Sequence, residues 1–122
     1  MSRWFESAQH HFQMKWFYLL IAIITEVIAT SALKETENFS KIIPSIIVII
    51  GYSLTFFFMS LTIREMSLGI TYAIWSGMGI FLIALIGYLR YDQVLDTPAL
   101  IGISLIIIGI IILRIFSKSV NI

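Results

Sequence analysis

Four long apolar segments, separated by short polar connections, dominate the pattern of this chain. Each has about the 20 residues that a helix needs to cross the hydrocarbon core of a bilayer, and together they cover approximately residues 16–33, 42–63, 68–89 and 98–116. Short connections force neighbouring helices to run antiparallel, and here they are residues 34–41, 64–67 and 90–97. The pattern predicts an all-α integral membrane protein of four transmembrane helices.

The composition narrows the function classes. The chain has 122 residues, of which 59% are hydrophobic and 12% charged, and its mean hydropathy of +0.97 is outside the range of soluble globular domains. The net charge of +1 argues against nucleic acid as a partner. There is no cysteine, so no disulfide framework or thiol chemistry is expected. We also expect no enzyme, because no nucleophile, metal cluster or phosphate loop converges in these segments.

The ends of the apolar segments predict one membrane domain at residues 14–117, between a polar N-terminal tail (1–13) and a short C-terminal tail (118–122). The first apolar segment follows Lys15, as in a signal peptide, but it is too long for one and contains an acid, so we expect it to be retained. His10 and His11 are adjacent, so their side chains diverge, and neither a metal site nor a cofactor is expected. Prolines mark two helix starts: Pro44 lies in a first turn, and Pro98 follows Thr97, the expected N-cap, with Asp96 behind it.

Glu26 is the one ionisable residue inside the first apolar segment. A charge at bilayer depth costs about 2.5 to 3.5 kcal/mol on insertion scales, so an intramembrane acid is by default a candidate for ion or substrate handling. The alternative is a buried acid held by a neighbouring helix, but the other apolar segments contain no Lys, Arg or His apart from Arg114, close to the end of the fourth. The sequence therefore predicts a proton or a cationic ligand as the partner of Glu26.

Side chains at helical spacing suggest a cavity around this acid. Small residues flank Glu26 on its own face at Ala22, Ala29 and Thr30. Aromatic residues with polar tips lie deep in the third segment, where they need a hydrogen-bond partner or a ligand. An aromatic wall beside a carboxylate suits a lipophilic cation, although aromatic stripes are more often core. The predicted cavity residues are Leu19, Ala22, Ile23, Thr30, Tyr52, Phe56, Met59, Tyr72, Trp75 and Ser76.

Glycines add two further expectations. Gly77 and Gly79 weaken the third helix, so we expect a hinge there that would serve alternating access. Gly102 and Gly109 are seven residues apart and lie on one face of the fourth helix. Small residues in this arrangement let membrane helices approach closely, which predicts a contact between the fourth helices of two chains.

A dimer is expected because four helices alone can hardly enclose an aqueous cavity while shielding Glu26 from lipid. Lys and Arg number five on the face with both termini and three on the opposite face, when Arg3, Lys15, Arg64, Arg114 and Lys118 are set against Lys34, Lys41 and Arg90. This weak bias is compatible with insertion in either orientation, and hence with an antiparallel dimer of one sequence. In such a dimer protons and a cation would compete for the carboxylates, and exchange would follow if the empty charged carrier reorients slowly.

Two motifs carry a specific resemblance. They are Thr25-Glu-Val-Ile-Ala-Thr-Ser-Ala-Leu-Lys34 and Tyr72-Ala-Ile-Trp-Ser-Gly-Met-Gly79, joined by a later segment from Tyr91 to Gly102. From Met14 to Phe116 the chain resembles the small multidrug resistance transporter family. The resemblance implies a proton-coupled antiporter that exports toxic cations from a multi-pass position in the bacterial plasma (inner) membrane, built as an antiparallel dimer. It gives Glu26 the family's glutamate position, Tyr52, Tyr72 and Trp75 its cavity aromatics, and Gly102 and Gly109 its dimer contact.

The sequence departs from the family pattern at Ser67, where proline is frequent, and in its longer N-terminal tail. Ala29 and Thr30 after the glutamate, together with Trp75-Ser76-Gly77, resemble the drug-exporting branch more than the guanidinium-exporting one. Three alternatives stay open from the sequence: export of guanidinium or polyamines, one subunit of a paired heterodimeric exporter, and a non-transporting membrane adaptor.

Overall fold

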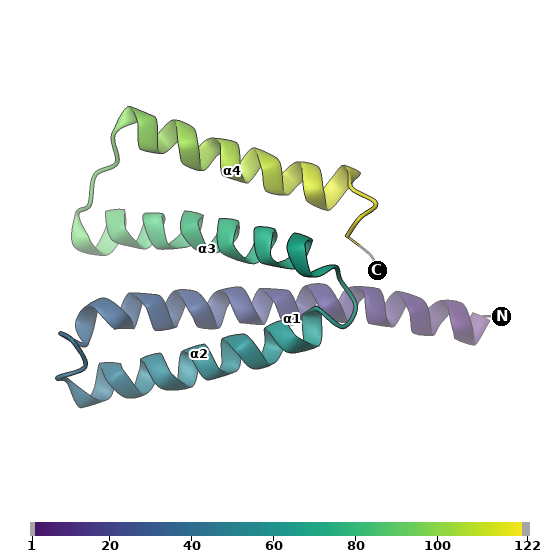
Figure 1. Cartoon of the computed structure of the whole chain (residues 1–122), viewed down its shortest axis with the longest axis horizontal. Coiled ribbons are helices and arrows are strands. Elements are labelled where there is room, and N and C mark those ends of the chain that lie inside the picture. Colours follow the sequence, from purple (N-terminus) through teal and green to yellow (C-terminus); the bar gives the residue numbers. More distant parts are fainter. Residues whose placement is uncertain (1, 121–122) are drawn as a thin grey trace.

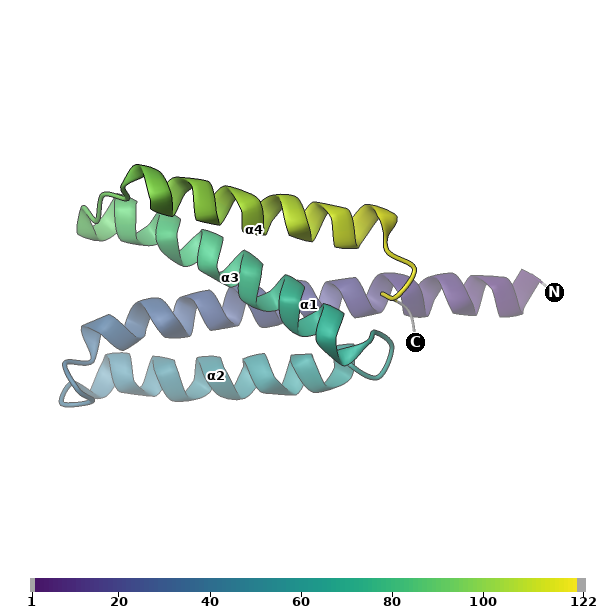
Figure 2. The same cartoon turned by 45° about the horizontal axis from the view of Figure 1, so that its top comes forward.

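The structure is a computed structural model that describes residues 2–120, with side chains from Met14 onward. Its regular elements are the helices α1 (Ser2–Glu35), α2 (Ile42–Thr62), α3 (Leu68–Tyr91) and α4 (Thr97–Phe116). Consecutive helices run antiparallel, and they lie side by side in the order α4, α3, α1, α2 (Figures 1 and 2). The α1–α2 and α3–α4 connections lie at one end, and both termini lie toward the other. The predicted all-helical class is confirmed.

All four helices are long and apolar enough to cross a membrane, and the crossing part of α1 is Met14–Glu35. The chain is therefore a multi-pass membrane protein. The backbone of α1 continues as helix back to Ser2, well before the start expected near residue 16, and projects beyond the other helices (Figure 1). Apolar content decides where a helix can enter a membrane, and it does not decide where the helix begins. The side chains of the predicted tail, including His10 and His11, lie outside those described.

A compact turn joins α1 to α2. Its centre is Thr36, which is 1% exposed and whose hydroxyl donates to the carbonyl of Leu33 at 2.8 Å and accepts from the amide of Phe39 at 3.2 Å. Glu37, Asn38 and Phe39 have φ values of 47°, 61° and 64°. This left-handed conformation is unfavourable for residues with a Cβ atom. The bonds of Thr36 and the packing of the two helices therefore hold the turn.

The start of α4 corrects one expectation. Asp96, rather than Thr97, is the N-cap: its backbone is extended and its carboxylate accepts from the amide of Ala99 at 3.0 Å. Thr97 takes the first helical position and Pro98 the second. The short Asp96 side chain satisfies an amide that would otherwise lack a partner at the helix start, and this fixes the start one residue earlier than the proline suggests.

Helices α1 and α2 pack through small residues. A methyl group at Gly51 would lie 2.8 Å from the Cβ atom of Ala29 and 3.2 Å from the carbonyl oxygen of Thr25. One turn further along α2, the hydroxyl of Thr55 lies 2.8 Å from that of Thr25. Ala29 and Thr55 are completely buried. Between membrane helices, such close approach supplies the packing that the hydrophobic effect cannot.

The other contacts are more apolar. Leu19, Ile23 and Val27 of α1 form the core together with Ile74 of α3. Helix α4 packs on α3 where Gly77 leaves room for side chains of α4. No residue of α4 is buried. Within this chain, α1 thus lies between α2 and α3, and α4 is the most exposed helix.

Candidate cation-binding site

Glu26 lies on α1 at the head of a short chain of hydroxyl groups. Its Oε1 atom accepts from the hydroxyl of Thr30, one turn later, at 2.6 Å. The same hydroxyl lies 2.6 Å from the phenol oxygen of Tyr52 on α2. Thr30 has a single hydroxyl proton and donates it to Glu26, so Tyr52 must be the donor in the second bond. Helix α2 thereby orients the carboxylate through Thr30.

The second carboxylate oxygen of Glu26, Oε2, is buried and has no hydrogen-bond partner among the described residues. It points toward α3 at Gly79, where a Cβ atom would lie only 3.0 Å from it. Ion pairs within residues 14–120 do not include Glu26. A buried acceptor without a partner is costly, and in native proteins a bound ion, a water molecule or a role in the chemistry of a site accounts for many such groups.

A cavity of about 310 Å³ opens beside this oxygen. It lies between α1 and α3 and is lined by Glu26, Thr30, Tyr72, Trp75, Ser76, Gly79, Ile80 and Ile83. The rings of Tyr72 and Trp75 form a tilted pair with centroids 5.4 Å apart. The indole nitrogen of Trp75 is also buried without an acceptor among the described residues. The cavity thus combines a carboxylate, two aromatic faces and apolar walls, which are the groups that attract a lipophilic cation.

The ten predicted cavity residues lie in three different environments. Thr30, Tyr72, Trp75 and Ser76 line the cavity with Glu26, and Tyr52 reaches it through Thr30. The other five lie elsewhere in this chain: Leu19, Ala22 and Ile23 are buried in the helix contacts, Met59 packs against the core, and Phe56 is 61% exposed and stacks on Tyr52. A cavity role for these five stays a prediction.

The four glycines predicted to form a hinge or a dimer contact have different surroundings. Gly79 admits the carboxylate of Glu26, and Gly77 admits Ile106 and Ile110 of α4. Both lie within the continuous helix α3, so the hinge stays a prediction. A methyl group at Gly102 or Gly109 would meet no atom of the described chain within 4 Å. The face of α4 that these two glycines mark is therefore open.

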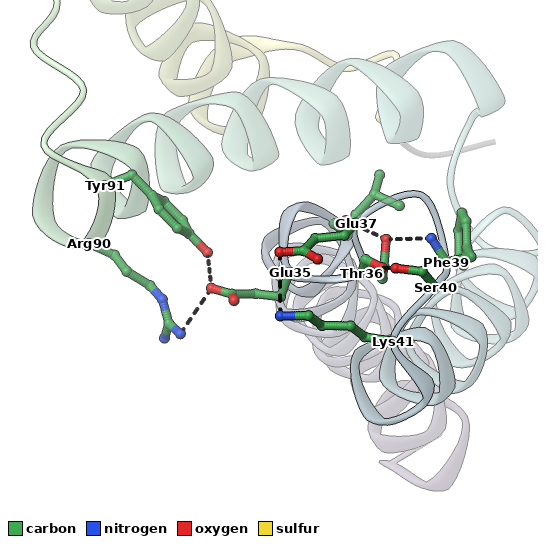
Figure 3. A network of polar contacts seen from close by, with 9 residues as sticks. Glu35, Thr36, Glu37, Phe39, Ser40, Lys41, Arg90 and Tyr91 are labelled. Atoms are coloured by element: carbon green, nitrogen blue, oxygen red, sulfur yellow. Dashed lines mark hydrogen bonds and ion pairs between the residues drawn. The ribbon is translucent and has the colours of Figure 1, made fainter.

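The sequence reasoning missed a polar cluster at the ends of α1 and α3. Glu35 accepts from the phenol of Tyr91 at 2.6 Å and from the guanidinium of Arg90 at 3.1 Å, on the same oxygen (Figure 3). Beside it, Lys41 and Glu37 form an ion pair at 3.4 Å within the α1–α2 turn. Glu35, Arg90 and Tyr91 lie at the ends of α1 and α3, far apart in the sequence, and only the parallel course of these two helices brings them together.

Four membrane-crossing helices, with a cavity in which a carboxylate lies beside an aromatic pair, define a membrane protein with a candidate cation site. Comparison with known proteins gives its family. Residues 14–106 match the family described as Small Multidrug Resistance protein, and the chain belongs to this family of multidrug transporters.

Several relatives are similar over most of their length. The quaternary ammonium compound-resistance protein QacE of Escherichia coli is 46% identical over 85% of this chain and 94% of its own. A multidrug transporter of Pseudomonas aeruginosa is 45% identical over the same shares. The quaternary ammonium compound-resistance protein QacG of a Staphylococcus species is 39% identical over 87% of this chain and 99% of its own.

Proposed function

We propose that this protein is a proton-coupled antiporter of the bacterial plasma (inner) membrane that exports lipophilic and quaternary ammonium cations. The observation that carries the proposal is the buried Oε2 atom of Glu26, which lacks a partner and faces a cavity with two aromatic rings. The names of two of these relatives, which refer to resistance to quaternary ammonium compounds, support this substrate class over guanidinium or polyamines.

The exchange follows from competition for one carboxylate. A cation binds when Glu26 is charged, and a proton displaces the cation by neutralising the carboxylate. The direction of the hydrogen bonds from Glu26 through Thr30 to Tyr52 depends on whether Oε1 carries a proton. Charged Oε1 accepts from Thr30, whereas a proton on Oε1 would be donated to Thr30 and would reverse the direction of the bond to Tyr52. Bending at Gly77 and Gly79 would present the site to each side of the membrane in turn.

The working unit is an antiparallel dimer in which both copies of Glu26 face one binding cavity. Two features of the single chain support this. Tyr72, at the edge of the cavity, is 59% exposed, so a second chain is needed to close the site. The open face of α4 at Gly102 and Gly109 offers a close contact between helices.

Replacing Gly109 with leucine is expected to weaken the dimer, because the larger side chain would prevent the two α4 helices from approaching each other. Crosslinking in membranes, at a fixed ratio of protein to lipid, would measure the loss. Gly69→Leu is the matched control, since this glycine also has open space around it but lies at the start of α3. Equal crosslinking of Gly109→Leu and the unchanged chain would contradict the contact at this face.

The transport activity is tested with the purified chain in liposomes, by following proton release when a cation is added. Tetraphenylphosphonium is expected to release protons, and at saturating cation the release should decline as the starting pH rises, because a carboxylate that is already charged has no proton to give up. Release with guanidinium alone would overturn the substrate class. No proton release with either cation would overturn the homodimeric antiporter and would favour one subunit of a paired exporter or a non-transporting adaptor.

A further inference from the structure

The cavity at Glu26 has a neighbour on the side of the bundle end that carries the α1–α2 and α3–α4 connections. This second cavity, of about 180 Å³, shares Thr30 and Ile83 with it as walls and is further lined by Ser31, Lys34, Ile86, Gly87, Tyr91 and Gln93. Both lie between α1 and α3. The two neighbouring cavities therefore form a line along these helices from the carboxylate toward that end of the bundle.

Tyr91 lies at the outer end of this line. It is the last residue of α3, it is partly buried, and its ring forms part of the second cavity wall. Gln93 folds back over Gly87 beside it, because the chain reverses after α3 at Asp92, which has a φ of 54°. A cation or water molecule that moves along this line between Glu26 and the end of the bundle passes Tyr91.

Bonds across the two helices hold Tyr91 in this position. Its hydroxyl donates to Glu35 of α1 at 2.6 Å, and Arg90 donates to the same oxygen at 3.1 Å (Figure 3). The Nζ atom of Lys34 lies 5.2 Å from the centroid of the Tyr91 ring, and the Cζ atom of Arg90 lies 5.7 Å from it. The Tyr91 ring and the Glu35 carboxylate therefore already bind cationic groups of the protein itself, those of Lys34 and Arg90.

We propose that Glu35, Arg90 and Tyr91 form a gate between Glu26 and the surface that carries these two connections. The gate is closed in this structure. It opens when the bonds to Glu35 break and the end of α3 separates from α1. An organic cation that passes can replace Arg90 at the carboxylate and at the ring, so exported cations would open the gate more readily than neutral molecules of the same size. The inference rests on the proposed function for what passes, and on the geometry alone for where the path closes.

Access to the closed path can be measured without transport. The chain contains no cysteine, and Ile83 lines both cavities of this line but not the larger cavity of about 860 Å³ that Ser31 borders together with the gate residues. Ile83→Cys therefore supplies a single thiol behind the gate. Its reaction rate with a water-soluble, membrane-impermeant thiol reagent, in lipid nanodiscs, reports how often the path opens.

Tyr91→Phe keeps the ring and removes the bond to Glu35, so it should raise the labelling rate roughly tenfold, the change that losing one hydrogen bond to a charged group allows. Glu35→Ala, which removes the acceptor of both bonds, should raise it further and serves if the first variant does not fold. Glu37→Gln is the matched control, because it removes an ion pair at the same end that lies within the α1–α2 turn.

Unchanged labelling in Tyr91→Phe and Glu35→Ala, or an equal increase in Glu37→Gln, would overturn the gate. Tetraphenylphosphonium binding by the unchanged chain in the same nanodiscs tests the proposed function separately. Faster labelling in the gate variants without any binding would keep the gate and reject the cation site. Binding without any change in labelling would keep the site and reject the gate.

Discussion

Glu26→Gln is expected to abolish proton-coupled export and to weaken tetraphenylphosphonium binding by about three orders of magnitude. The amide keeps the shape of the side chain and can still accept from Thr30, but it removes the charge. Two charges about 4 Å apart attract each other by about 4 kcal/mol at an effective dielectric constant of about 20, which corresponds to roughly a thousandfold in affinity. Isothermal titration in detergent and proton release in liposomes would measure the two losses.

Glu37→Gln provides the control for a general charge effect, because Glu37 is an exposed acid in the α1–α2 turn. It should bind and transport normally. The Glu26 variant should remain dimeric, which crosslinking would verify, so that lost transport is not mistaken for lost assembly. Proton-driven export at the normal rate by Glu26→Gln would end the assignment of this residue.

Gly51→Ala is expected to lower the free energy of unfolding by about 1 to 3 kcal/mol, the usual cost of forcing extra atoms into a packed contact. The new methyl group would lie 2.8 Å from the Cβ atom and 3.4 Å from the Cα atom of Ala29. These atoms belong to the helix framework and cannot rotate away, so α1 and α2 must separate. Unfolding of the purified protein in mixed detergent micelles, followed by circular dichroism, would measure the change.

The control for Gly51 is Gly69→Ala. A methyl group at Gly69 meets nothing within 4 Å, and alanine favours a helix over glycine by up to about 1 kcal/mol. This variant should be as stable as the unchanged chain or slightly more so. Loss of stability in both variants would show that the close approach at Gly51 is not the cause.

The sequence predicted the helices well because membrane helices are specified by long apolar segments. Helices α2, α3 and α4 begin and end within two residues of the expected positions. The errors arise where other forces act. Asp96 starts α4 through a side-chain hydrogen bond to the backbone, and the backbone of α1 extends as helix to Ser2, where hydropathy gives no signal.

The site was predictable along each helix and less so between helices. The spacing of Tyr72, Trp75 and Ser76 placed them on one face, and the structure brings this face to Glu26. Their contact with Glu26 required the packing of α3 on α1, which a sequence pattern does not contain. The Tyr52–Thr30 bond and the meeting of Glu35 with Tyr91 join residues 22 and 56 positions apart, so neither could be read from local spacing.

Helix α4 contributes no buried side chain to its own chain, whereas the residues around Glu26 all come from α1 and α3. In the proposed dimer, partner choice and cation chemistry would therefore be encoded in separate parts of one short sequence. Mutations in α4 could turn a self-pairing chain into one half of a matched pair after gene duplication, while the cation site stayed unaltered. Helix α4 would then be the part of the protein that is freest to diverge.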